Sequence, residues 1–138
     1  DHVRAKAERC VVESERVAAA LPAVGPGPDG RAVLRAWLPQ YFEHYRTHGA
    51  VIRAWAEQQV ADHRLTDLGR SAFGHITGSF AERLPDAPGG RRARELRAIA
   101  LLAMIERFAY VWTSRDLGWS DDQVYDTLAG LIHRAFFR

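Results

Sequence analysis

The spacing of the apolar residues is the feature that most constrains how this chain can fold. No stretch alternates apolar and polar residues with a period of two, which is the pattern of a half-buried strand. Apolar residues instead recur every three or four positions, which places them on one face of an α-helix. Two segments rich in proline and glycine, 22–30 and 85–90, interrupt this pattern. The sequence therefore predicts an all-α fold.

About six helices are predicted, and the breaks and capping signals set their limits. Ser120 with Gln123 predicts a capping box at the start of the last helix, with two aspartates in its first turn. Pro39 lies in the middle of the second helix, where it removes a backbone hydrogen bond and should cause a kink. The predicted ranges are 3–21, 31–48, 50–59, 62–84, 92–115 and 120–137.

Length and composition exclude several classes of protein. A chain of 138 residues supports one domain with one core. Its 19 lysines and arginines against 17 acidic residues give a net charge of +2, too small a surplus for a dense basic surface that binds nucleic acid. The single Cys10 excludes an internal disulfide and a multi-cysteine metal site. The nearly apolar run 98–112 contains Glu106 and Arg107 and is shorter than the roughly 20 residues of a membrane span.

Large aromatic side chains occur on several predicted helices, close to Pro39 and to three glycines of the fourth helix, Gly69, Gly74 and Gly78. Large residues beside small ones leave gaps in packing, and gaps lined by aromatic rings resemble ligand pockets between helices. We expect the pocket to adapt at the proline and the glycines. A well-filled core, with glycines that only allow close helix packing, remains the alternative.

The last two predicted helices are apolar over more than one face. A helix that is apolar nearly all round needs partners on both sides. In a chain of this size, pairing with a second copy would supply them. The sequence therefore predicts a homodimer.

Two segments resemble the tetracycline-repressor (TetR) family of bacterial transcription regulators. Residues 100–138, ALLAMIERFAYVWTSRDLGWSDDQVYDTLAGLIHRAFFR, resemble the end of these proteins: a long apolar helix with an internal Glu-Arg pair, a short acidic turn and an Asp-Thr-Leu final helix. Residues 41–58, YFEHYRTHGAVIRAWAEQ, are similar to the junction of the family's fifth and sixth helices. In family order, the six predicted helices would be the fourth to the ninth.

The resemblance implies a domain organisation and a set of partners. In the family, an N-terminal helix-turn-helix reads operator DNA, and a helical C-terminal domain binds a small molecule and dimerises. Residues 1–138 would be the C-terminal domain alone, and helix 1–21 would lead from the missing DNA-binding domain. The expected partners are a second copy and a lipophilic or aromatic effector, with operator DNA reached only through the missing domain. We expect a cytoplasmic protein with no cofactor and no membrane partner.

The same resemblance implies roles for individual residues, each of which could equally be plain core. The last two helices would form a four-helix interface with their counterparts in the second copy, through Tyr110, Val111, Thr127, Leu128, Leu131, Ile132 and Ala135. The other helices would enclose the pocket, with a lining of Leu34, Trp37, Leu38, Tyr41, Tyr45, Trp55, Phe73, Ile76, Phe80, Leu102, Ile105, Ala109 and Trp112.

Several polar residues allow two interpretations. His44 and His48 are four residues apart, which is half of a zinc site, but no further ligand is evident, and a histidine also suits a helix C-terminus. Glu106 and Arg107 could anchor a ligand, or they could pair with a polar group on a neighbouring helix of the same chain or of the second copy; we favour pairing. The arginines at 91, 92, 94 and 97 could attract an anion, but a solvated helix start is favoured.

Catalysis finds little support in the sequence. No Ser-His-Asp order, phosphate-binding glycine loop or Glu-x-x-His pair stands out, and Cys10 falls on an apolar helix face. We therefore expect no catalytic residue, no metal site and no enzyme. Three functions remain open: a ligand-sensing and dimerisation domain, a helical dimerisation module with a filled core, and a small helical enzyme that uses the aromatic pocket.

Overall fold

The computed structural model describes residues 1–138 and contains no strand, which confirms the all-α prediction. It has five α-helices rather than about six, and a short π-helical segment continues α5 at the C-terminus. The bounds are α1 His2–Ala19, α2 Pro28–Ala56, α3 His63–Arg83, α4 Gly90–Ser114, α5 Asp121–Ile132 and η1 His133–Phe137. None of these helices has the length and apolar character needed to cross a membrane.

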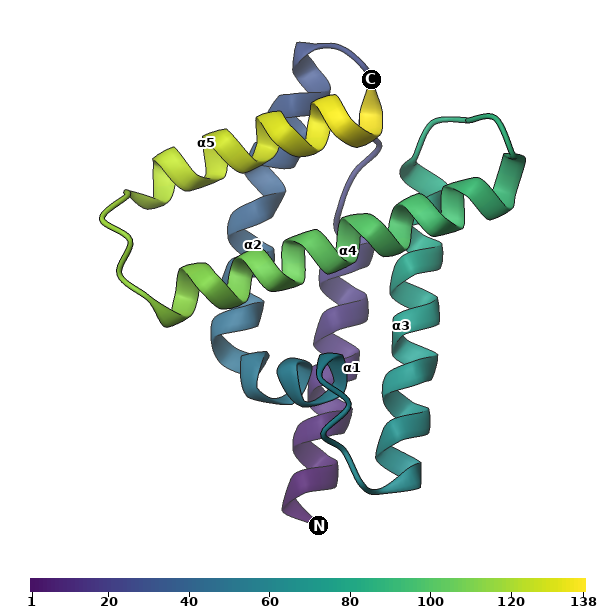
Figure 1. Cartoon of the computed structure of the whole chain (residues 1–138), viewed down its shortest axis with the longest axis vertical. Helices are drawn as coiled ribbons and strands as arrows, with labels where there is room; N and C mark the ends of the chain where they lie inside the picture. The colour runs from purple at the N-terminus through teal and green to yellow at the C-terminus, as the bar shows by residue number, and fades with distance from the viewer.

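The helix number was predicted wrongly because the second and third predicted helices form one helix, α2. Gly49, which separates the predicted helices 31–48 and 50–59, is buried inside α2, and an added Cβ there would lie 3.1 Å from the Tyr45 ring. The helix also starts earlier than predicted, at Pro28, since proline suits the first turn of a helix. It continues through Pro39, and its last turns bend away from the preceding part (Figure 1).

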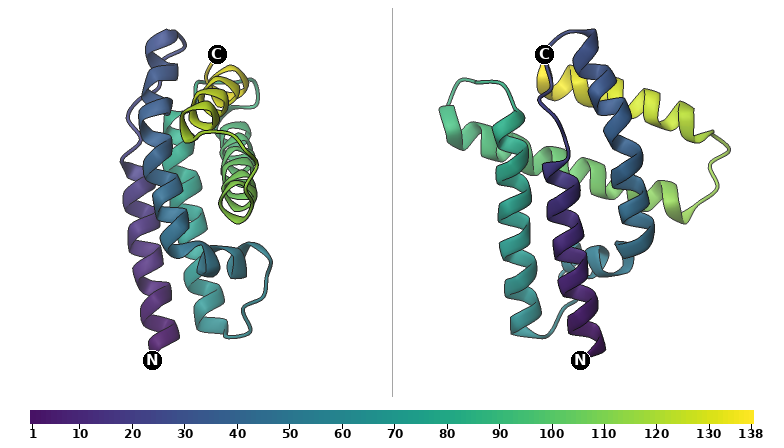
Figure 2. Two further views of the ribbon diagram at one scale, coloured as in Figure 1. Left: turned by 90° about the vertical axis from the view of Figure 1, so that its left-hand side faces the viewer. Right: turned by 180° about the vertical axis from the view of Figure 1, so that it is seen from behind.

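The helices form two layers. α1, α2 and α3 run roughly along the longest axis of the molecule, and α4 and α5 cross them side by side (Figures 1 and 2). The core lies between the layers and includes Trp37, Phe42, Phe80, Leu101 and Ile105, each at most 2% exposed. Phe80 of α3 meets Trp37 of α2 edge-on, with ring centroids 5.8 Å apart.

Two other helices hold the C-terminal end of α1. The Trp37 indole N–H donates a hydrogen bond to the Val17 carbonyl at 2.8 Å. The Arg83 guanidinium of α3 donates to the Ala19 carbonyl at 3.0 Å and also to the Leu21 carbonyl. The Ala19 carbonyl is one of those that the end of a helix leaves without a partner inside the helix. The predicted capping box is confirmed at the start of α5, where Ser120 and Gln123 bond each other's backbone N–H.

The three glycines of α3 differ in their surroundings. A Cβ at Gly69 would lie 2.5 to 2.7 Å from the Trp55 indole ring, so Trp55 packs directly on the backbone of α3. At Gly74 and Gly78, a Cβ would meet nothing within 4 Å. The interpretation that Gly74 and Gly78 allow close helix packing is therefore wrong, because no neighbour approaches either position.

The contrast between these glycines predicts opposite effects of alanine. Gly74→Ala and Gly78→Ala should each raise the free energy of unfolding by roughly 0.5–1 kcal/mol, because alanine is the better helix former and the space is open. Gly69→Ala should lower it, because the Trp55 ring must move. Urea denaturation of the three variants measures these changes, and destabilisation by Gly74→Ala would show that α3 is packed on that face after all.

Candidate ligand-binding cavity

A cavity of about 920 Å³ lies between α1, the end of α2, α3 and α4. Ligand pockets commonly enclose about 300–1,000 Å³ with a mainly apolar lining and a few polar groups. This cavity has both properties, since 13 of its 22 lining residues are hydrophobic. The lining residues are Val11, Ser14, Ala18, Tyr41, His44, Ile52, Trp55, Ala56, Glu57, Gln58, Val60, Thr66, Gly69, Arg70, Ala72, Phe73, Ile76, Phe80, Leu102, Ala103, Glu106 and Arg107.

The structure brings about half of the predicted pocket residues together. Those that line the cavity are Tyr41, Trp55, Phe73, Ile76, Phe80 and Leu102. The rest do not reach it: Leu34, Trp37, Leu38, Tyr45, Ile105 and Ala109 are buried in the core, and Trp112 is half-buried against it. These seven residues fill space between the two layers of helices, so the cavity does not lie between Tyr45 and Trp112.

Two parts of the lining were not predicted. Val11, Ser14 and Ala18 bring α1 into the cavity wall. The connection from α2 to α3 and the first turn of α3 contribute Glu57, Gln58, Val60 and Thr66. The sequence carries a signal for α1, because Val11, Ser14 and Ala18 are spaced by three and four positions within the predicted helix 3–21 and therefore share one face. The connection carries no periodic pattern, and nothing in its sequence indicates that it folds against the cavity.

Trp55 forms a wall of the cavity through two contacts with α3. Its ring packs on the backbone at Gly69, and its indole N–H donates a hydrogen bond to the Leu65 carbonyl at 2.9 Å. An indole fixed by one hydrogen bond and one flat contact has little freedom to turn. The Trp55 side chain therefore helps to fix the distance between the end of α2 and the first half of α3.

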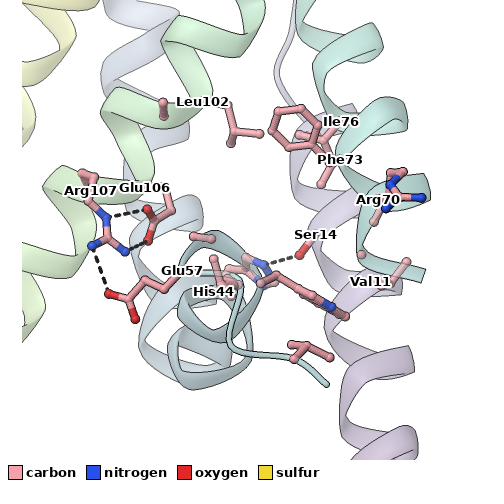
Figure 3. A pocket seen from close by; sticks show the side chains of 18 of the residues that line it. Val11, Ser14, His44, Glu57, Arg70, Phe73, Ile76, Leu102, Glu106 and Arg107 are labelled. Carbon is pink, nitrogen blue, oxygen red and sulfur yellow. Dashed lines mark hydrogen bonds and ion pairs between the residues drawn. The ribbon is translucent and has the colours of Figure 1, made fainter. Parts of the chain in front are cut away.

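A buried hydrogen bond joins α1 to α2 at the cavity surface. His44 Nε2 lies 2.8 Å from Ser14 Oγ, and His44 is only 7% exposed (Figure 3). Burial lowers the pKa of His44 to about 4; the neighbouring His48 and Arg16 act in the same direction, and Glu13 opposes them. The imidazole is therefore neutral at neutral pH.

A second polar cluster lies where α4 meets the end of α2. The Glu106 carboxylate accepts hydrogen bonds from the Tyr45 hydroxyl at 3.0 Å and from Arg107 Nε and Nη2 at 2.8 and 3.1 Å. Arg107 also donates to Glu57 at 3.3 Å (Figure 3). Burial and the Glu106 charge raise the pKa of Tyr45 to about 12. The favoured interpretation, that Glu106 pairs with a polar group on a neighbouring helix, therefore agrees with the geometry.

Tyr41, which lies one turn before Tyr45 on α2, differs from Tyr45 in its hydrogen bonding. It lines the cavity and is 7% exposed, yet its hydroxyl makes no hydrogen bond within the protein. Burial raises the pKa of its phenol, with the negative charge of Glu106 as a further cause. Tyr41 is therefore a protonated hydroxyl at the cavity surface that is free to bond an occupant.

The other polar residues considered for a functional role are His48, Cys10 and the arginine cluster at 91–97. The His44 and His48 rings are 5.0 Å apart, but no group of three or more His, Cys, Asp or Glu side chains comes together to hold a metal. Cys10 is fully buried, and burial raises the pKa of its thiol. In the arginine cluster, salt bridges join Arg91 to Glu95 and Arg94 to Asp86, and Arg97 donates to carbonyls near the C-terminus.

The predicted dimer residues fall into three groups by exposure. Thr127, Leu131 and Ala135 are exposed and follow one another at intervals of four, which places them on one outer stripe of α5 and η1. Tyr110 and Val111 of α4 are half-buried. Leu128 and Ile132 are at most 2% exposed and belong to the core of the single chain, so neither offers an outer surface to a second copy.

Comparison of the chain with protein-family models, with curated proteins and with solved structures gives no match in any of the three. The cavity and the exposed stripe of α5 are the features of the chain that bear on its function. The cavity offers neutral hydrogen-bonding groups and a saturated carboxylate on a largely apolar surface. Such a surface is suited to binding an apolar molecule.

The buried His44 predicts a specific pH dependence of stability. Its pKa is about 4 in the folded chain against 6.5 in the unfolded chain. As the pH falls from 6.5 to 4, the unfolded chain takes up a proton that the folded chain does not, so the free energy of unfolding falls over this window. Above pH 6.5 the stabilisation is complete.

Urea denaturation at pH 7.5 and pH 5 should therefore show a larger loss of stability in the natural protein than in a His44→Gln variant. The variant removes the His44 imidazole and keeps every other ionisable side chain, so the difference between the two losses reports on His44. Equal losses would show that His44 is protonated in the folded state with no penalty.

Proposed function

We propose that this chain is the ligand-sensing and dimerisation domain of a TetR-type transcription regulator, a repressor whose effector is an apolar or aromatic small molecule. The cavity between α1, α2, α3 and α4 is the observation that supports this function most. Its volume and mainly apolar lining match those of small-molecule sites. A filled helical bundle would leave no such space.

The place of α1 in the cavity wall supports a way to transmit binding. Val11, Ser14 and Ala18 would touch the effector directly, while Trp37 and Arg83 hold the end of the same helix. An effector that fits one packing of α1 better than another shifts the population toward it. In the full regulator, α1 would lead to the DNA-reading domain, and a change in its tilt would spoil the match between two such domains and the operator half-sites.

The exposed stripe of α5 supports the homodimer. Leu131 is 48% exposed between Thr127 and Ala135, and the half-buried Tyr110 and Val111 lie on the neighbouring α4. Two copies that join α4 and α5 in a four-helix interface would cover this stripe. Leu128 and Ile132 would contribute from within each protomer, by fixing the orientation of α5.

A dimerisation module without a ligand is the second candidate. It is favoured by the core residues that fill the space where part of the pocket was predicted, Trp37 and Tyr45 above all. This candidate also predicts a homodimer, and it differs from the first only in that the cavity binds no ligand. Ligand binding therefore separates the two candidates.

N-phenyl-1-naphthylamine, an uncharged apolar dye that fluoresces when it leaves water, tests whether the cavity binds. We expect the dye to bind and to raise the melting temperature. Ala72→Trp, which adds an indole at the cavity wall on α3, should weaken binding by about tenfold or more, equivalent to about 1.4 kcal/mol.

Ala100→Trp is the matched control for this experiment, because Ala100 is an exposed residue of α4 that does not line the cavity. This variant should bind the dye as the natural protein does. Absence of binding by this dye and by a broad set of apolar compounds would favour the dimerisation module with a filled core.

Leu131→Arg tests the dimer. A charge in the middle of the exposed stripe would have to lose its hydration in the interface, so the variant should be monomeric and folded. Val12→Arg is the control, because Val12 is 66% exposed on α1, outside the proposed interface. Sedimentation or light scattering measures the mass. A natural protein that is monomeric at high concentration would contradict the dimer.

A further inference from the structure

The following inference rests on the proposed function, in which the cavity binds a small molecule. We infer that the occupant is uncharged and carries a hydroxyl or carbonyl group that bonds the Tyr41 hydroxyl beside the Ser14–His44 pair, while its apolar body lies against the aromatic and aliphatic walls. The class of possible effectors is then restricted from all lipophilic molecules to neutral molecules with a polar group at one position.

The charges of the cavity lining are already neutralised by the protein. Of the four ionisable residues other than His44 and Tyr41, only Glu106 is buried, at 8% exposed. Its two oxygens accept three hydrogen bonds from Tyr45 and Arg107. Arg107 is in turn shared with Glu57, and Arg70 lies 3.4 Å from Asp67 on the exposed side of α3.

This neutralisation penalises an ionised ligand. A carboxylate or ammonium group that enters the buried part of the cavity loses its hydration, and no free counter-charge replaces it. His44 does not supply one, because its pKa of about 4 leaves the ring neutral. A neutral ligand avoids the penalty.

The free hydroxyl of Tyr41 gives the cavity one specific polar contact. A phenol both donates and accepts a hydrogen bond, so a hydroxyl at the cavity surface with no partner in the protein is available to a ligand. Tyr41 and His44 lie side by side one helical turn apart on α2, with ring centroids 6.3 Å apart, and Ser14 faces them from α1. A ligand hydroxyl or carbonyl placed at Tyr41 would satisfy that hydroxyl and meet the dipoles of Ser14 and His44.

The rest of the lining is suited to an apolar body. The side chains of Trp55, Phe73 and Phe80 contribute aromatic surface, and those of Ile52, Ile76 and Leu102 contribute aliphatic surface. They come from α2, α3 and α4, so they surround the space rather than form one flat face. An elongated or fused-ring molecule with a single polar end matches this distribution.

A matched pair of dyes tests the charge. N-phenyl-1-naphthylamine is neutral, and 8-anilinonaphthalene-1-sulfonate is the same ring system with a sulfonate. We expect the neutral dye to bind at least tenfold more tightly, with a signal that Ala72→Trp reduces and Ala100→Trp leaves unchanged. If the sulfonate binds equally well or better in the same cavity, the inference is wrong while the proposed function stands. If neither dye binds, the proposed function fails, and the inference fails with it.

A second pair of probes tests the contact with Tyr41. 1-Naphthol and 1-methylnaphthalene have similar size, but only the first can bond a hydroxyl, and each can be titrated as a competitor of the neutral dye. Tyr41→Phe should weaken the binding of 1-naphthol several-fold and leave that of 1-methylnaphthalene unchanged. Tyr125→Phe, on α5 and outside the cavity, should affect neither. Equal changes for both competitors, or no change for either, would overturn the assignment of the polar contact to Tyr41.

Discussion

The attachment of the C-terminal end of α1 to α2 and α3 is the interaction on which the rest of the arrangement depends. The Val17 and Ala19 carbonyls accept hydrogen bonds from Trp37 and Arg83, at 2.8 and 3.0 Å, so two helices satisfy the same helix end. With that end fixed, the preceding turns of α1, including Ser14, form part of the cavity wall. Under the proposed function, an occupant would therefore act on the N-terminal part of α1, which the bonds from Trp37 and Arg83 do not hold.

The opposite wall of the cavity depends on the absence of a side chain at Gly69. Because Gly69 has no Cβ, Trp55 can lie flat on the backbone of α3, and its bond to the Leu65 carbonyl fixes the ring there. The end of α2 thus stays close to α3, while the residues of α4 approach from the other layer. At the cavity surface on α4, Glu106 accepts hydrogen bonds from Arg107 and from Tyr45.

Local signals in the sequence predicted the all-α class, the breaks at 22–30 and 85–90 and the capping box of α5, because each depends on neighbouring residues only. Gly49 shows where such signals fail: it is buried inside α2 beside the Tyr45 ring, although glycine commonly ends helices. Helix periodicity identified the apolar faces but not which part of each face meets a neighbour. Tyr41 and Tyr45 share a face of α2, yet only Tyr41 lines the cavity. On α5, Leu128 points to the core and Leu131 points to solvent.

The four tryptophan indole N–H signals in a nitrogen-15 spectrum offer the most direct test of where a ligand binds. Of these residues only Trp55 lines the cavity, while Trp37 is core, Trp112 is half-buried and Trp119 is 63% exposed. On titration with N-phenyl-1-naphthylamine, the account predicts a large shift of the Trp55 signal and small or no shifts of the Trp112 and Trp119 signals. An unchanged Trp55 signal at saturating dye, or a shift centred on Trp112, would contradict it.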